Sequence, residues 1–271
     1  MNLCEPKLNC TTIGKEVKKG DLLGQGAVKK VYLASWRGHS VVWNEPNVQN
    51  NFTADYNHGT KMLKELQSPY VTQILGWCNS IVITEYHKLG TARNVNEILD
   101  SSFGKADKSA AAKFRIQLCI DYAEILSYLH HGKTDKTFVM CDSNDLEKTL
   151  SQYLLTADLH LVLNDVDSLA VIDNELGNMI KCGHKELNGD FVAPEQLWPF
   201  EDRDFVDSEM PPYNEKTDIW KIPNVCNFFL DSHTKNKLQL MDIHLKCKNV
   251  HPNRRPSATE ILETYKNILL E

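Results

Sequence analysis

Hydrophobic and polar positions divide the chain into a first part rich in short strands and a second part rich in helices. Within residues 17–43, apolar runs such as 31–34 are brief and are separated by glycines, a pattern typical of strands joined by tight turns. Apolar spacing over residues 54–66 predicts one helix, and residues 71–75 and 81–84 predict two more strands. We therefore expect a sheet with a single helix at the start of the chain.

Helical periodicity dominates after Gly90. Leu118, Tyr122, Ile125 and Leu129 recur at steps of four, three and four residues, which predicts a long amphipathic helix.

A capping box near the end of the chain predicts a terminal helix. Ser257 and Glu260 are spaced so that each side chain can accept a hydrogen bond from the other's backbone N–H. Together the two parts of the chain predict an α+β fold. The apolar stripe of the terminal helix comprises Ile261, Leu262, Tyr265, Ile268 and Leu269.

Composition and charge exclude some classes of function. Hydrophobic residues make up 42% and charged residues 24% of the 271 residues, so the chain can bury a substantial core. A net charge of −6 gives no basic surface of the kind that nucleic-acid binding requires. No apolar run approaches the ~20 residues of a membrane span, so we expect no part of the given sequence to anchor in a membrane.

The cysteines permit disulfides but do not identify them. None shows the C-x-x-C spacing of a zinc site, and buried thiols are an equally good interpretation of their number. Eight cysteines allow about a hundred pairings, so the connectivity stays open. They are Cys4, Cys10, Cys78, Cys119, Cys141, Cys182, Cys226 and Cys247.

A glycine-rich turn lies between two strand-like runs. Gly24-Gln25-Gly26 is followed by Lys29 and Val31, as in a loop that covers a nucleotide. Taken alone, this pattern is better explained by an ordinary hairpin turn, so its interpretation depends on the rest of the chain.

Four distinctive motifs follow one another along the chain. They are Ile-Thr-Glu-Tyr at 83–86, Phe-Val-Ala-Pro-Glu at 191–195, Asp-Ile-Trp at 218–220 and Pro-Asn-Arg-Arg-Pro at 252–256. Their order is typical of the protein kinase family, which the chain resembles over roughly residues 17–271. The first motif resembles the hinge that holds adenine, the second resembles the end of an activation segment, and the last two resemble motifs of the larger lobe.

The resemblance implies a single domain with a bilobal, kinase-like fold. We expect a β-rich N-lobe at about residues 15–86, a hinge at about 85–91 and a mostly helical C-lobe at about 92–271. The family pattern also implies ATP as phosphate donor with Mg²⁺ or Mn²⁺. It further implies an ion pair between Glu195 and Arg255 that is structural rather than catalytic.

The catalytic loop departs from the family pattern. Met140-Cys141 replace the usual His-Arg, and Asp142 keeps the position of the base that orients the attacking hydroxyl. Asn144 stands where the family has a catalytic lysine, which argues against an ordinary Ser/Thr protein kinase. Counted directly, the position of the metal-binding asparagine falls at Glu147. If the following apolar triplet is aligned instead, the loop carries an insertion and Gln152, ten residues after Asp142, takes that position.

Asp165 is the second predicted metal ligand. The sequence Asn164-Asp165-Val166 resembles the Asp-Phe-Gly region of kinases, although the phenylalanine and glycine are absent. Asp167 competes for the same role, but we interpret it as a solvated turn residue.

The usual phosphate-binding lysine is missing. The strand that should end in lysine ends in Asn44, and the position of its glutamate partner falls at Gly59 or His58. Lys29 replaces the third glycine of the loop, as in the with-no-lysine kinases, so we expect its ammonium to reach the phosphates. Strand alternation then directs Lys30 to solvent.

The same resemblance supplies the remaining binding predictions, in which loop backbone covers the phosphates and hinge backbone holds adenine. The predicted nucleotide-binding residues are Gly24, Gln25, Gly26, Lys29, Val31, Glu85 and Tyr86, and the predicted catalytic residues are Asp142, Lys29 and Asn144.

Three longer strings, at residues 140–146, 149–155 and 189–199, resemble the O-mannose kinases within this family. That resemblance implies transfer of the ATP γ-phosphate to the 6-hydroxyl of an O-linked mannose in a core trisaccharide of α-dystroglycan. It also implies an enzyme of the endoplasmic reticulum lumen, tethered by an N-terminal transmembrane segment, where oxidising surroundings favour disulfides. Two alternatives stay open: a pseudokinase scaffold that binds glycan or a partner, and an atypical Ser/Thr protein kinase.

Overall fold

The computed structural model describes residues 7–103, 108–132, 136–172, 179–230 and 235–270, which form two compact units. The first unit contains residues 7–88 together with 163–168, and the second contains the other described residues.

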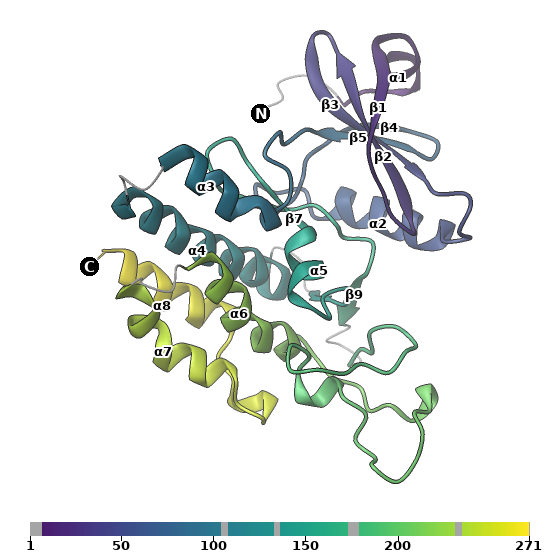
Figure 1. Ribbon diagram of the computed structural model, residues 1–271. Coiled ribbons are helices and arrows are strands. Elements are labelled where there is room, and N and C mark those ends of the chain that lie inside the picture. The colour runs from purple at the N-terminus through teal and green to yellow at the C-terminus, as the bar shows by residue number, and fades with distance from the viewer. Residues whose placement is uncertain (1–6, 104–107, 133–135, 173–178, 231–234, 271) are drawn as a thin grey trace. The chain divides into compact units, whose positions relative to one another are not determined.

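The first unit is built on a five-stranded antiparallel sheet with the strand order β1-β2-β3-β5-β4 (Figure 1). Strands β2 and β3 are joined by a two-residue turn in which Arg37 and Gly38 both have positive φ, 50° and 82°, as tight hairpins require. The strands are β1 (Val17–Gln25), β2 (Lys29–Trp36), β3 (His39–Pro46), β4 (Ile74–Cys78) and β5 (Ile81–Glu85).

Two helices belong to this unit. Helix α2 (Thr53–Glu65) confirms the helix predicted at residues 54–66. Helix α1 (Cys10–Glu16) was not predicted; it begins after Asn9, whose Oδ1 accepts a hydrogen bond from Thr12 N at 2.9 Å. Ile13 of α1 joins the buried core of the sheet, which also includes Trp36 and Ile83.

The fourth strand begins later than the sequence predicts. Strand β5 confirms the prediction at residues 81–84, but the strand expected at 71–75 begins only at Ile74. Val71 instead pairs with Leu163, and Thr72 N donates to Leu163 O at 2.9 Å. These bonds attach residues 163–168 to the first unit.

Helices dominate the second unit. Helix α4 packs against α6 and α8, and α7 packs against the same two helices (Figure 1). Leu118, Ile125 and Leu129 of α4 are completely buried, which confirms the predicted amphipathic helix. The helices are α3 (Val95–Phe103), α4 (Lys108–His131), α5 (Leu146–Ser151), α6 (Lys216–Phe229), α7 (Lys235–Cys247) and α8 (Ala258–Leu270), with single 3-10 turns η1 (Ala92–Asn94), η2 (Pro194–Gln196), η3 (Asp207–Glu209) and η4 (Pro252–Arg254).

Two small sheets hold the segments between these helices. Strand β6 (Thr137–Met140) pairs with β9 (Leu169–Ile172), and β7 (Tyr153–Leu155) pairs with β8 (Leu161–Leu163). An antiparallel sheet in one unit and mostly helices in the other confirm the predicted α+β class.

Two polar predictions in the second unit are also confirmed. Arg255 donates two parallel hydrogen bonds to the Glu195 carboxylate, at 2.6 and 2.7 Å, so the predicted ion pair is present. The capping box of α8 is complete, because Ser257 N donates to Glu260 Oε2 and Glu260 N donates to Ser257 Oγ.

The structure resolves which cysteines pair. Cys10–Cys78 forms a disulfide within the first unit and Cys141–Cys182 forms one within the second, which confirms the expectation of disulfides. Cys119, Cys226 and Cys247 are unpaired and buried, and Cys4 lies outside the described residues. Among the helices described, none is both long and apolar enough to cross a bilayer.

Candidate active site

Lys29 is the first residue of β2 and directly follows the glycine turn. Gly26 N donates to Lys29 O at 2.9 Å, which closes the turn, and Gly24 pairs with Val31 across the sheet. Because side chains alternate along a strand, Lys29 and Lys30 project to opposite faces.

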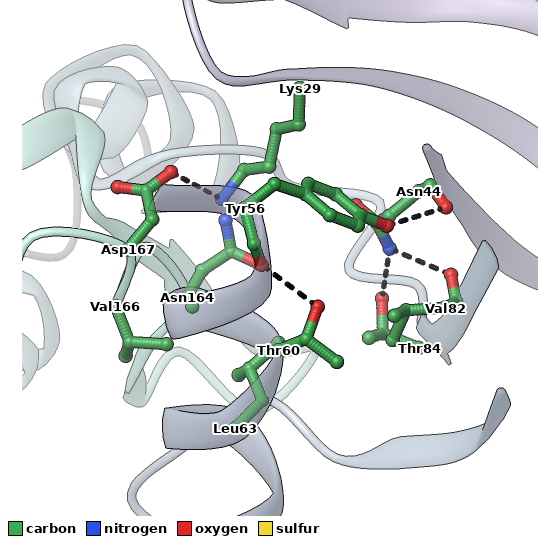
Figure 2. A pocket seen from close by; sticks show the side chains of 11 residues that line it. Lys29, Asn44, Tyr56, Thr60, Leu63, Val82, Thr84, Asn164, Val166 and Asp167 are labelled. Atoms are coloured by element: carbon green, nitrogen blue, oxygen red, sulfur yellow. Dashed lines mark hydrogen bonds and ion pairs between the residues drawn. The ribbon is translucent and has the colours of Figure 1, made fainter. Parts of the chain in front are cut away.

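The Lys29 ammonium lies between two carboxylates. Its Nζ is 2.7 Å from Asp165 Oδ1. The same Nζ is 3.5 Å from Asp167 Oδ2, an ion pair that Figure 2 shows. Burial lowers the pKa of Lys29, but the attraction of the two carboxylates outweighs burial and holds this pKa above its ordinary value. The first unit therefore contains a lysine that stays charged in a partly buried position.

Asp167 is buried, so the interpretation of this residue as a solvated turn residue was wrong. Its exposed fraction is 8%, and it packs on Gly59 of α2 so closely that a Cβ added at Gly59 would lie 2.8 Å from Asp167 Cβ. Burial raises the pKa of Asp167 to about 6, against the opposing effect of Lys29. The absence of a side chain at position 59 leaves room for this carboxylate.

Asn44 occupies the strand position at which kinases have their lysine, and its amide is used by the sheet. Asn44 Nδ2 donates to Val82 O and to Thr84 Oγ1, both at 3.2 Å, while Asn44 O accepts from the Tyr56 hydroxyl at 3.0 Å. These residues and Lys29 line one pocket (Figure 2).

The other residues predicted to bind nucleotide lie at strand ends of the first unit. Gln25 ends β1 and pairs with Lys30. Glu85 ends β5, where its N donates to Gln73 O at 3.1 Å and its Oε1 accepts from Gln73 N at 2.9 Å. Tyr86 follows it and is half-buried. Their contacts with adenine and phosphate stay predictions.

Asp142, in the second unit, follows strand β6 and forms an ion pair with Lys148. The two side chains are 35% and 41% exposed, and Asp142 Oδ2 lies 2.6 Å from Lys148 Nζ. Lys148 lies on α5, which is the predicted insertion between Asp142 and Gln152. Lys148 was not predicted, because no sequence pattern shows that a lysine on the six-residue helix α5 lies next to Asp142.

Gln152 and Asp142 are brought together by the fold. Gln152 is 2% exposed, and its Nε2 donates to the backbone O of Asp142. Within the described part of the chain, Gln152 Oε1 and Asn144 Oδ1 are buried oxygens that have no hydrogen-bond partner. Such oxygens are costly unless a ligand engages them, and an amide oxygen is a donor that Mg²⁺ accepts.

The comparison with known proteins decides the family. The chain is 49% identical to the protein O-mannose kinase of Gallus gallus over 273 residues, which cover 98% of the chain and 76% of that protein. It is 44% identical to the protein O-mannose kinase of Homo sapiens over 275 residues, which cover 99% of the chain and 77% of that protein. The chain belongs to the protein O-mannose kinase family.

Wider matches agree with a kinase fold for this O-mannose kinase family member. The dual specificity protein kinase shkE of Dictyostelium discoideum is 24% identical over 281 residues, which cover 93% of the chain and 36% of that protein. No family model matches the chain. Membership of the protein O-mannose kinase family makes the protein a phosphotransferase with an alcohol acceptor.

A divalent cation fits the donors found in this O-mannose kinase family member. Among the described residues, no group of three or more His, Cys, Asp or Glu side chains forms a protein cage for a metal. Mg²⁺ in nucleotide sites needs no such cage, because one or two carboxylates plus substrate phosphates and waters complete its shell. Each unit contains an oxygen donor of this kind, the Asp165 carboxylate in the first and the unpaired Gln152 Oε1 in the second.

Proposed function

We propose that this protein transfers the γ-phosphate of ATP to the 6-hydroxyl of an O-linked mannose, in a core trisaccharide carried by α-dystroglycan. The activity named for its relatives supports a glycan acceptor. The observation that carries the proposal is the Lys29 ammonium held between Asp165 and Asp167. A pseudokinase that had lost its strand lysine would not need a charge cluster formed by β2 and residues 165–167.

In the proposed reaction, Asp142 accepts the proton of the mannose hydroxyl as its oxygen attacks the γ-phosphorus. The bond from phosphorus to the β,γ-bridging oxygen breaks, and ADP leaves with the electron pair. Lys29 binds the phosphates. Lys148, 2.6 Å from Asp142, supplies a cation at the catalytic loop that Asn144 cannot provide.

The residues proposed to hold the cation, Mg²⁺ or Mn²⁺, are Asp165 and Gln152. When bound, the cation neutralises phosphate charge that develops during transfer. We further propose that the loop residues Gly24, Gln25, Gly26 and Val31 cover the phosphates, and that the backbone of Glu85 and Tyr86 holds adenine.

We place the proposed reaction in the endoplasmic reticulum lumen. Two disulfides support an oxidising compartment, because such bonds are rare where thiols are kept reduced.

A transfer assay tests the proposal. Purified protein, γ-labelled ATP and Mg²⁺ or Mn²⁺ are incubated with the O-mannosyl trisaccharide, with its 6-deoxymannose analogue, and with Ser/Thr peptides. We expect label in the trisaccharide alone, and none with Asp142→Ala at unchanged melting temperature. Label in peptides but not in glycan identifies an atypical protein kinase instead, and no transfer by folded protein identifies a scaffold.

A further inference from the structure

A lysine without a role in the proposed reaction is completely buried in the second unit. Lys221 lies on α6, and its side chain is 1% exposed. Lysine is almost never fully buried unless its ammonium is paired, because removing the charge from water is costly. Burial lowers the pKa of Lys221, although Asp218 and Glu195 favour its charged form. The contacts of Lys221 should therefore explain why a lysine is buried at this position.

The Lys221 ammonium is directed at residues 140–143, here called the catalytic segment because Asp142 belongs to it. Lys221 Nζ donates to Ser143 Oγ at 2.6 Å, and Ser143 Oγ donates in turn to Met140 O at 2.6 Å. Ser143 is itself 1% exposed, so this chain of hydrogen bonds is shielded from water. Asp218 Oδ1 lies 4.0 Å from the same ammonium.

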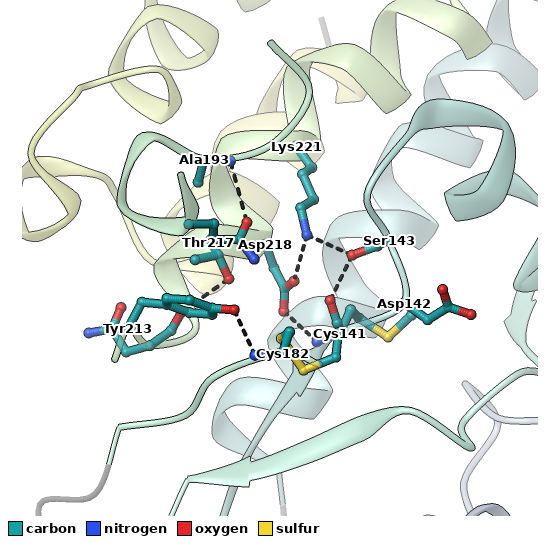
Figure 3. The surroundings of a disulfide bond; sticks show 12 residues. Cys141, Asp142, Ser143, Cys182, Ala193, Tyr213, Thr217, Asp218 and Lys221 are labelled. Atoms are coloured by element: carbon teal, nitrogen blue, oxygen red, sulfur yellow. Dashed lines mark hydrogen bonds and ion pairs between the residues drawn. A yellow bond between two sulfur atoms is a disulfide. The ribbon is translucent and has the colours of Figure 1, made fainter. Parts of the chain in front are cut away.

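Helix α6 holds the catalytic segment at both ends. Asp218 Oδ2 accepts a hydrogen bond from Met140 N at 3.1 Å, at the start of the segment, and Lys221 binds Ser143 at its end. Cys141 is fixed between them by its disulfide to Cys182. Figure 3 shows Lys221 and Asp218 directed to the segment, while the Asp142 carboxylate points away from them. The backbone around Asp142 is thus anchored on one side, and its carboxylate is left available on the other.

We propose that Lys221 is a positioning residue for phosphate transfer, whose buried ammonium fixes Ser143 and thereby the backbone that carries Asp142. This inference rests on the proposed role of Asp142 as base. Lys221 touches neither substrate nor reacting atoms, and it acts through the geometry of the catalytic segment. A general base needs its oxygen within hydrogen-bond reach of the proton it removes, so a small displacement of this backbone lowers the rate.

A role in stability and a role in catalysis make different predictions for this lysine. Replacing a whole buried ion pair by apolar groups of similar volume is often neutral or stabilising, but removing one partner is destabilising. Without Lys221 the buried Asp218 carboxylate loses the ammonium 4.0 Å away, so stability should fall in either case. A lysine that serves only the fold should keep its turnover when replaced, whereas a lysine that positions Asp142 should also lose turnover.

Lys221→Met tests this directly in the full chain, with kcat, KM for ATP and melting temperature as readouts. We expect kcat to fall about tenfold or more, as for the loss of a hydrogen bond to a charged group, while KM for ATP stays within about twofold. The melting temperature should fall, because the buried Asp218 carboxylate loses the ammonium 4.0 Å away, so kcat is measured at a temperature where circular dichroism shows the variant folded. The matched control is Lys216→Met on the same helix, whose ammonium binds Pro256 O and which should keep wild-type kcat.

Ser143→Ala removes the other partner of the Lys221–Ser143 hydrogen bond, so it tests the inference even if Lys221→Met does not fold. We expect a similar fall in kcat, and no further fall when Lys221→Met is added, because the two residues act as one unit. Wild-type kcat in folded Ser143→Ala or folded Lys221→Met overturns the inference. It is also overturned if the fall in kcat of the double variant equals the product of the falls in the two single variants. Failure of the proposed function is distinguishable from failure of this inference, because the wild-type protein would then transfer no phosphate at all.

Discussion

Two acidic side chains share one lysine in the first unit, and this arrangement sets the chemistry of the pocket at the level of single residues. Lys29 compensates Asp165 at 2.7 Å, so Asp167 is the carboxylate whose charge is incompletely matched. The raised pKa of Asp167, about 6, reflects that mismatch and its burial. A polyanionic nucleotide accompanied by a divalent cation would change this charge balance, which is consistent with the proposed phosphate site.

Removal of the Lys29 ammonium should abolish most of the activity. Lys29→Met deletes the cation and leaves Asp165 and Asp167 facing each other, so we expect kcat/KM for ATP to fall by about two orders of magnitude. Steady-state kinetics on purified protein measure this. Lys30→Met, on the opposite face of the same strand, should have little effect, and the reverse pattern would assign the phosphate role to Lys30.

The close packing at Gly59 should make even one methyl group harmful. Gly59→Ala places a Cβ within 2.8 Å of Asp167 Cβ and 3.0 Å of its Cα, so backbone must move and we expect a loss of about 1–3 kcal/mol in the free energy of unfolding. KM for ATP should rise as well. In Gly14→Ala on α1 the new methyl meets no atom within 4 Å, so that variant should gain up to about 1 kcal/mol. Urea unfolding compares the two, and equal effects would contradict the packing argument.

Local spacing in the sequence was sufficient to nominate candidate site residues, whereas burial and contacts between distant segments could not be predicted. Asp142 and Asp165 could be named because each follows a strand-like run, and Gln152 could be named because it directly precedes one. The burial of Asp167 could not be predicted, since it requires the bare backbone of Gly59 more than a hundred residues earlier. Lys148 was missed for a similar reason, because only the folded α5 brings it to Asp142.

At the scale of elements, short helix α5 is the structural form of the predicted insertion. Its N-cap is Asp145, whose Oδ1 accepts a hydrogen bond from Lys148 N at 2.7 Å, and its C-cap is Gln152. An isolated helix of this length is unstable in water, so its cap and its buried residues Thr149 and Leu150 must hold it in place. The element thus connects two proposed site residues through a local structure of low intrinsic stability.

Loss of the Asp145 cap should therefore lower activity more than loss of a comparable cap on another helix. Asp145→Ala and Ser257→Ala each remove an N-terminal cap, and each should cost about 1 kcal/mol in the free energy of unfolding. Only Asp145→Ala should also lower kcat, because fraying of α5 displaces Lys148 and Gln152. Chemical unfolding and kinetics on both variants measure this, and an unchanged kcat in Asp145→Ala would show that α5 holds its shape without the cap.

The cap of α8 should respond to pH with a defined sign. Hydrogen bonds from Ser257 N and Oγ lower the pKa of Glu260 from 4.5. A carboxylate with a lowered folded-state pKa stabilises above its unfolded value, and this contribution is lost as pH falls through the folded value. The stability difference between wild type and Glu260→Gln should accordingly shrink below pH 4.5, measured by unfolding at several pH values. Glu263→Gln on the same helix serves as the control, and a difference that grows on acidification would refute the argument.

For the whole molecule, hydrophobic patterning predicted the fold class and the sequence left the covalent framework open. The long apolar spacing of α4 and the cap of α8 were sufficient to predict those helices. Cysteine pairing depends on which strands and loops meet in space, so spacing along the chain could not reveal Cys10–Cys78 or Cys141–Cys182. The structure assigns one disulfide to each unit.

The two disulfides should contribute similarly to stability and differently to catalysis. Their cysteines are 68 and 41 residues apart, so the chain-entropy argument gives each about 4 kcal/mol. Cys141 adjoins Asp142, whereas Cys10 and Cys78 join α1 to β4 in the other unit. We expect the double serine variant of Cys141 and Cys182 to lose both stability and kcat, and that of Cys10 and Cys78 to lose stability with kcat retained. Both are assayed at a temperature where circular dichroism shows them folded, and equal kcat in the two would mean that the Cys141 disulfide does not position the catalytic segment.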